Sequence, residues 1–183
     1  MLGPVIIGER VRLVPPKPEM LDTFCRWFED TDVTRYLNNI FPFTLDAEKE
    51  WFADVSKDKD SVFWAVIATD GAEERLIGTT GIHAIHPVHH SASSGNLIGE
   101  KSEWGKGYGS EVVRLRTRFA FDELNLHKIN TNVYLPNIGS QRVLEKAGYK
   151  TVGIAREHIW RNGKYLDVWF AEILRSDWLA AQQ

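Results

Sequence analysis

The chain has 183 residues, of which 43% are hydrophobic and 26% charged, and its formal net charge at pH 7 is −3. This length fits one domain with a full core, and the mildly acidic balance argues against a nucleic-acid-binding surface. A single cysteine, Cys25, excludes an internal disulfide and a cysteine-based metal site, which is typical of a reducing compartment. We expect Cys25 to be a small core residue.

The start of the chain, MLGPVIIGER, lacks the basic region and the long apolar run of a signal peptide. No apolar stretch approaches the roughly 20 residues that cross a bilayer. We therefore expect a soluble cytoplasmic protein with one domain over residues 1–183 and a core over about residues 10–175.

Hydrophobic periodicity and turn residues divide the chain into elements. The first half predicts, in order, a strand over 10–14, a helix over 19–29, a short helix and loop over 30–39, a helix from an Asp46 cap to about 56, strands over 62–68 and 75–85, a polar loop over 86–94 and a short strand over 95–99. The second half predicts a helix over about 107–123, a strand over 128–134, a helix over 138–147 that Gly148 ends, and a closing hairpin of 149–160 and 164–174. This order indicates a mixed α/β (α+β) fold, with a mostly antiparallel central sheet of about 6–7 strands covered by helices.

Residues 104–111, WGKGYGSE, place three glycines at alternate positions before a predicted helix. The cluster is not a dinucleotide fingerprint, because Val112 takes the third glycine position, and it is not a P-loop, because Gly107 follows Lys106. An anion site at a helix N-terminus fits better, since bare backbone N–H groups and the helix dipole favour a pyrophosphate. On these residues alone, a plain glycine-rich turn is the alternative.

A second motif, NIGSQRVLEKAGY, follows at residues 137–149. With it the chain resembles the GNAT superfamily of N-acetyltransferases, and most of all the branch of ribosomal-protein N-terminal acetyltransferases and related small-molecule acetyltransferases. The resemblance covers nearly the whole chain and includes RVRLVPP (10–16), VTRYL (33–37), LIGTTGI (76–82) and REHIWRNGKYLDVWFAEILRSDW (156–178). It implies a GNAT-like domain that transfers an acetyl group from acetyl-CoA to a primary amine, either a protein N-terminus or a small molecule, by direct attack in a ternary complex.

The resemblance also implies where coenzyme A binds. The family's acyl-CoA loop pattern, Gln/Arg-x-x-Gly-x-Gly/Ala, falls on residues 104–109, with Trp104 at the first position. The loop backbone would hold the pyrophosphate, and the preceding strand would pair with the pantetheine arm. Arg114, Arg116, Arg118 or Arg142 would meet the 3′-phosphate, a solvated helix face being the alternative for each. The implied acetyl-CoA contacts are Leu97, Ile98, Gly99, Trp104, Gly105, Lys106, Gly107, Tyr108, Gly109, Ser110, Asn137, Ser140 and Arg142.

For the chemistry, the resemblance implies a backbone N–H near Gly99 that stabilises the developing oxyanion. Many relatives protonate the leaving thiolate with a tyrosine seven residues after the motif asparagine, where this chain has Leu144. Ser140, three residues after Asn137, is the expected replacement, with local helix capping as its alternative role.

Three residues are candidates for the general base: Glu157, Glu100 and His83. A chain of water molecules ending on backbone groups could take the proton instead. We take Glu157 as the expected base. The resemblance implies an acceptor pocket with Tyr36, Asn38, Asn39 and His83. The aromatic residues Trp27, Phe28, Trp51, Phe52 and Trp64 either line this pocket or belong to the core.

The remaining expectations concern partners. His83, His86, His89 and His90 lack nearby cysteine or acidic residues, so no metal site is expected. The expected partners are acetyl-CoA and an amine, with no nucleic acid or membrane, and a homodimer is common in the branch. A non-catalytic acyl-CoA-binding regulatory module is the alternative function, because the usual tyrosine is missing.

Overall fold

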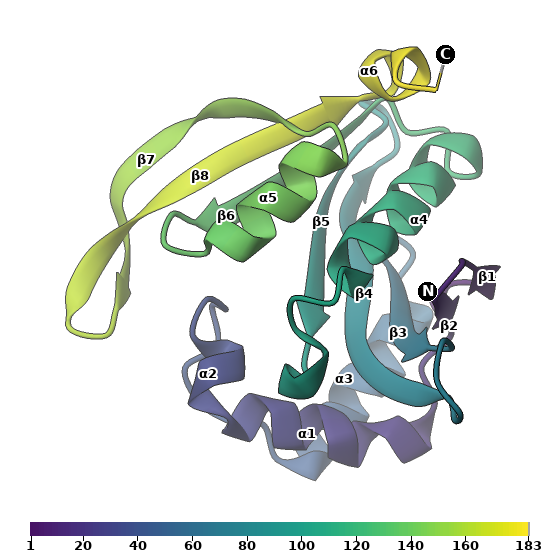
Figure 1. Cartoon of the computed structure of the whole chain (residues 1–183), viewed down its shortest axis with the longest axis vertical. Coiled ribbons are helices and arrows are strands. Elements are labelled where there is room, and N and C mark those ends of the chain that lie inside the picture. The colour runs from purple at the N-terminus through teal and green to yellow at the C-terminus, as the bar shows by residue number, and fades with distance from the viewer. Residues whose placement is uncertain (183) are drawn as a thin grey trace.

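The computed structural model describes residues 1–182 and is built on an eight-stranded mixed sheet in the order β1-β2-β3-β4-β5-β6-β8-β7 (Figure 1). The strands are β1 Ile6–Ile7, β2 Val11–Val14, β3 Val62–Ala68, β4 Arg75–His86, β5 Ser91–Ile98, β6 Lys128–Tyr134, β7 Lys150–Arg161 and β8 Lys164–Leu174. The α-helices are α1 Leu21–Glu29, α2 Thr31–Thr34, α3 Leu45–Lys57, α4 Tyr108–Asp122, α5 Ile138–Lys146 and α6 Arg175–Ala180, with short 3₁₀ helices η1 Pro18–Met20 and η2 Lys101–Glu103.

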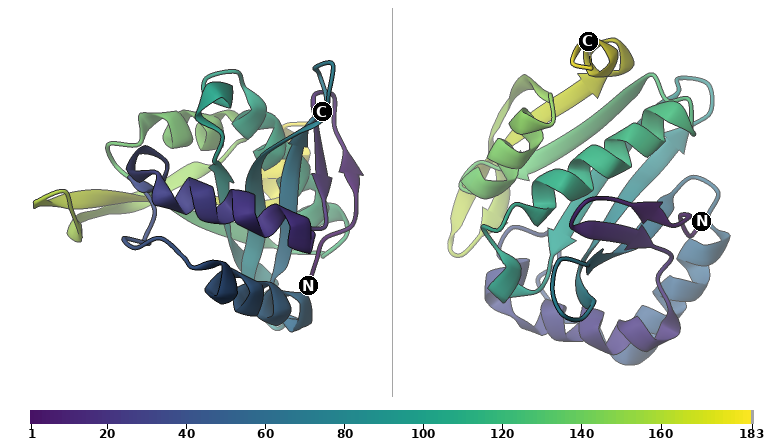
Figure 2. Two further views of the ribbon diagram at one scale, coloured as in Figure 1. Left: turned by 90° about the horizontal axis from the view of Figure 1, so that it is seen from below. Right: turned by 45° about the vertical axis from the view of Figure 1, so that its right-hand side comes forward.

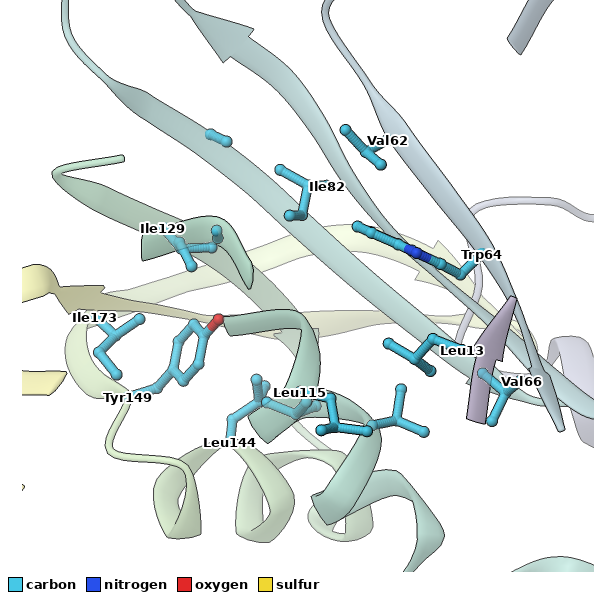
Figure 3. Packing of buried hydrophobic residues seen from close by; sticks show 14 of the residues in the cluster. Leu13, Val62, Trp64, Val66, Ile82, Leu115, Ile129, Leu144, Tyr149 and Ile173 are labelled. Atoms are coloured by element: carbon cyan, nitrogen blue, oxygen red, sulfur yellow. The ribbon is translucent and has the colours of Figure 1, made fainter. Parts of the chain in front are cut away.

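Helices cover both faces of the sheet, and the alternation of side chains along each strand decides which helix packs where. In β3, Trp64 and Val66 pack into the main core with α4, whereas Ala65 between them packs against α1. Figure 3 shows the main core, in which Trp64 lies among aliphatic side chains of neighbouring strands and α4. Thus α4 and α5 lie on one face, and α1 and α3 lie on the other (Figure 2).

The sheet opens between β5 and β6. These strands pair in parallel over three residue pairs, from Ser91↔Lys128 to Ser93↔Asn130. Beyond them, the described part of β5 pairs with β4 alone, and the rest of β6 pairs with β8 alone. The strands therefore diverge, and backbone that would be buried in a closed sheet faces an opening.

Most predicted elements are present, and the differences have local causes. The short strand β1, which was not predicted, pairs with β2, and the sheet therefore has eight strands rather than the expected six or seven. Residues 91–94 belong to β5 instead of the predicted loop, because Pro87–His90 alone make the turn. The cap of α3 is Thr44, whose hydroxyl accepts from the Ala47 N–H at 3.2 Å, and not Asp46.

The predicted end of α5 is confirmed, because Gly148 follows the last turn with φ +91°, a left-handed value suited to glycine. Cys25 is buried in α1, as expected for a core residue. Among the helices of residues 1–182, none has the length and apolar character that a bilayer crossing requires.

Gly99, just after β5, gives a test of this packing. A Cβ built on Gly99 would lie 2.1 Å from the Trp27 ring, whereas one on Gly95, within β5, would meet nothing within 4 Å. We expect Gly99→Ala to lower the free energy of unfolding by about 1–3 kcal/mol through overpacking, measured by chemical denaturation. Gly95→Ala is the matched control, and equal stability of the two variants would contradict the close contact.

Candidate functional site

A cavity of about 620 Å³ lies where β5 and β6 diverge. Its walls include residues 94–97 of β5, residues 131–134 of β6, and side chains of α1, α3 and the loop between α2 and α3. Its aromatic lining is Phe24, Trp27, Phe28, Tyr36, Phe43, Trp51, Phe63 and Tyr134. This volume falls in the usual range for small-molecule sites, which are mostly apolar with a few placed polar groups.

The glycine-rich loop of residues 104–109, which we call the glycine ribbon, leads into the start of α4 and lies outside the walls of this cavity. Gly105 and Gly107 have φ values of +76° and +93°, and Gly107 is the N-cap of the helix. A Cβ on Gly105 would meet nothing within 4 Å, and one on Gly107 would come no closer than 3.7 Å to Arg10. The ribbon therefore needs glycine for its backbone conformation, and its outer side is free for an anion at a helix N-terminus.

The side chains of this loop hold it in place. Lys106 Nζ pairs with Glu103 at 3.0 Å, so its charge already has a partner. The Tyr108 hydroxyl donates to Asp70 at 2.7 Å, and Trp104 Nε1 donates to the Ile98 carbonyl at 2.7 Å. Any contact of these residues with a phosphate would accordingly be made mainly by their backbone.

The arginines proposed for a 3′-phosphate separate into two kinds. Arg116 is fully buried and donates to Thr80 Oγ1 at 3.0 Å and to the Gly95 carbonyl at 2.7 Å, so the proposal is wrong for this residue. Arg114, Arg118 and Arg142 are exposed, and Arg118 pairs with Asp122. Arg142 stays a prediction.

The N-terminus of α5 lines the cavity with Asn137 and Ser140. Asn137 is the N-cap, because its Oδ1 accepts from the Ser140 N–H at 3.2 Å. The Ser140 hydroxyl does not provide the cap, and within residues 1–182 it makes no hydrogen bond. Leu144, where the resemblance led us to look for a tyrosine, lines the same cavity.

The three candidate bases lie in different places. Glu157 is exposed at a bulge of β7, and Glu100 is exposed and accepts from Ser102; neither lines the cavity. His83 lines the cavity, and burial lowers its pKa, helped by the positive charge of Arg116. The Gly99 N–H donates to the Ile77 carbonyl at 2.9 Å, so it is not free for an oxyanion.

Tyr36, Asn38 and Asn39 line the cavity, and the loop that contains them is held by hydrogen bonds from Arg161 and Tyr134, which we call the latch. Arg161, at the end of β7, donates through Nη2 to the carbonyls of Thr34, Leu37 and Asn39. Next to it, the Tyr134 hydroxyl donates to Asn38 Oδ1 at 2.7 Å. The β7–β8 hairpin thereby fixes one wall of the cavity.

Glu48 of α3 belongs to the cavity wall but was not predicted from the sequence. This glutamate lines the cavity and is only 5% exposed, and burial raises its pKa. Its spacing to Trp51 and Val55 is i, i+3 and i+7, which puts it on the apolar face of the helix. That spacing was the available signal. Of the predicted aromatic residues, Trp27, Phe28 and Trp51 line the cavity, whereas Trp64 is buried in the core.

The structure thus has an open glycine ribbon at a helix N-terminus, which suits an anion, and a separate cavity of small-molecule size where β5 and β6 diverge. Residues 10–150 match the acetyltransferase (GNAT) domain family. The chain is 39% identical over 140 residues to the probable N-acetyltransferase YjcK of Bacillus subtilis (strain 168), covering 74% of this chain and 75% of the relative. It is 31% identical over 110 residues to the spermidine N(1)-acetyltransferase of Vibrio cholerae, covering 60% and 63%.

Among solved structures, that of a spermidine N-acetyltransferase from Vibrio cholerae in complex with CoA and spermine has the same fold, with a TM-score of 0.86 at 23% identity over 94% of this chain and 99% of that one. The chain belongs to the GNAT acetyltransferase domain family. It is an acetyl-CoA-dependent acetyltransferase that acts on an amine. No group of three or more metal-ligating side chains occurs within residues 1–182.

The latch around Arg161 predicts a selective kinetic effect. Arg161→Gln removes the guanidinium that donates to the loop carbonyls, so the cavity wall that contains Tyr36, Asn38 and Asn39, the residues expected to bind the acceptor, should lose its fixed position. We expect the KM for the amine to rise about tenfold, the size of effect typical of a lost charged hydrogen bond, with the KM for acetyl-CoA unchanged. Steady-state kinetics with each substrate varied in turn measures both, and an equal rise of the two KM values would contradict a local role.

Proposed function

We propose that this protein acetylates a primary amine that enters the cavity from the side of α1 and α3, while the thioester of acetyl-CoA reaches the cavity through the opening between β5 and β6. The supporting observation is that one cavity is lined both by the diverging strands and by the aromatic residues of the two helices. Donor and acceptor would then meet in a ternary complex. The open glycine ribbon supports the binding of the pyrophosphate.

Bound acetyl-CoA supplies a thioester, whose acyl carbon forms a bond to the amine nitrogen as the carbon–sulfur bond breaks. The attacking amine must be neutral, and an alkyl amine has an unperturbed pKa of about 10.4. We assign the uptake of its proton to His83, the one candidate base that lines the cavity. Because its pKa is lowered, His83 is neutral at pH 7 and able to accept a proton.

We assign the leaving thiolate to Ser140, whose hydroxyl is free to donate, with Asn137 holding the start of α5. The oxyanion donor, expected near Gly99, would come from an earlier residue of β5, since the Gly99 N–H is already bonded. The homodimer common in the branch stays a prediction.

The glycine ribbon is tested without disturbing the fold at Gly109, in the first turn of α4. A Cβ there would come no closer than 3.8 Å to Val143, and φ is not positive. We expect Gly109→Leu to raise the KM for acetyl-CoA at least about tenfold, because a bulky side chain blocks the approach of an anion to the helix N-terminus. Gly109→Ala is the control, since the loop pattern accepts alanine at this position.

The readout for both variants is thiol release with a panel of amines, together with the mass of the product. If Gly109→Leu bound acetyl-CoA with wild-type affinity, the proposal that the glycine ribbon binds the pyrophosphate would be wrong. Binding of acetyl-CoA without turnover of any amine would instead favour a regulatory module.

The role of His83 predicts a pH effect. Protonated imidazole cannot accept a proton, so kcat/KM for the amine should fall as pH drops through the lowered pKa of His83, below the ordinary value of about 6.5. His83→Gln should lower kcat/KM about 100-fold at pH 7 and lose this part of the pH dependence. If the acid side of the profile were unchanged in His83→Gln, the assignment to His83 would fail.

A further inference from the structure

Glu48 is a buried carboxylate without a protein partner. It is 5% exposed and lines the cavity, yet no hydrogen bond or ion pair to its side chain occurs among residues 1–182. A buried charge is costly unless it is paired. Because Glu48 lines the cavity, a ligand there can supply the missing partner.

The surroundings of Glu48 suit a cation. The residues that line the cavity include no lysine or arginine within the described chain. Trp51, one turn further along α3, and Trp27 and Phe28 of α1 line the same cavity, and the Phe28 and Phe43 rings meet edge to face at 4.8 Å. Aromatic faces attract ammonium groups, and more strongly when water is excluded.

Glu48 is also well placed to bind a nitrogen other than the one that reacts. It belongs to α3, on one face of the sheet, whereas Asn137 and Ser140 belong to the start of α5 on the other face (Figure 1). A carboxylate that held the reacting amine would keep it protonated and unreactive. A carboxylate at the far wall instead fits a second, permanently protonated group of the same molecule.

We propose that Glu48 and the neighbouring rings form a subsite for a second ammonium group of the acceptor, so that the preferred acceptors are flexible alkyl amines with two or more protonated nitrogens. This inference rests on the proposed function. The cavity volume of about 620 Å³, within the usual range for small-molecule sites, favours a small molecule over a protein N-terminus.

The test compares two acceptors of equal size, 1,5-diaminopentane and n-hexylamine, in which a methyl group replaces one ammonium. The wild type should prefer the diamine at least about tenfold in kcat/KM, the scale of a desolvated charge pair. Glu48→Gln should remove this preference and leave n-hexylamine within about twofold of wild type. Glu50→Gln, an exposed position on the same helix, is the matched control and should behave as wild type.

Three outcomes would overturn the proposal: no preference for the diamine in the wild type, an equal loss on both amines in Glu48→Gln, or faster acetylation of a lysine-containing peptide at its N-terminus than of the diamine. The last would assign the subsite to a peptide.

Calorimetric titration of 1,5-diaminopentane without acetyl-CoA separates this inference from the proposed function. Binding by the wild type and by Glu50→Gln, lost in Glu48→Gln, would support the subsite even if no amine in the panel were acetylated. Equal binding by all three proteins would overturn it.

Discussion

Three residue pairs of parallel strand, between β5 and β6, are the constraint on which the site depends. Backbone polar groups that leave a sheet ladder must find other partners. Here side chains take some of them: Thr131 donates to the Ser94 carbonyl at 3.1 Å, and Trp104 donates to the Ile98 carbonyl. Carbonyl groups at both ends of the diverging part of β5 therefore already have partners, and the cavity lies beside this segment.

The opening also brings residues from helices on opposite faces of the sheet to one cavity. In the proposed complex, the core of α4 and α5 would support the phosphate and thiol side, and the smaller cluster of α1 and α3 would support the amine side. Burial in the cavity shifts its two titratable groups toward their neutral forms, since it raises the pKa of Glu48 and lowers that of His83. The neutral form suits the role of base that we propose for His83, whereas Glu48 would regain its charge when a cation binds.

Sequence reasoning succeeded where one physical signal dominated. The strands Val62–Ala68 and Lys128–Tyr134 match the predicted ranges, because strongly apolar or alternating segments leave little choice of conformation. It failed where the signal was weak or shared: the serines at the start of β5 resemble a loop, and Thr44 and Asp46 are both good caps.

For the site, the family motifs led to Asn137, Ser140, His83 and the loop around Tyr36, all of which line the cavity. Arg116 was wrongly proposed as a phosphate contact, and Glu48 was not predicted at all. Both errors have the same cause. Charged residues are usually exposed, and only the packing of the helices reveals that these two side chains are buried.

The single thiol of the chain has a practical consequence for enzymology. Cys25 is buried in α1, and burial, together with the nearby negative charge of Glu48, raises its pKa. Since the thiolate is the reactive species, the folded enzyme should contribute little background when a chromogenic disulfide reagent is used to follow free coenzyme A. Denaturation, in contrast, would expose one titratable sulfhydryl for each polypeptide, so the same reagent reports both catalysis and the integrity of the preparation.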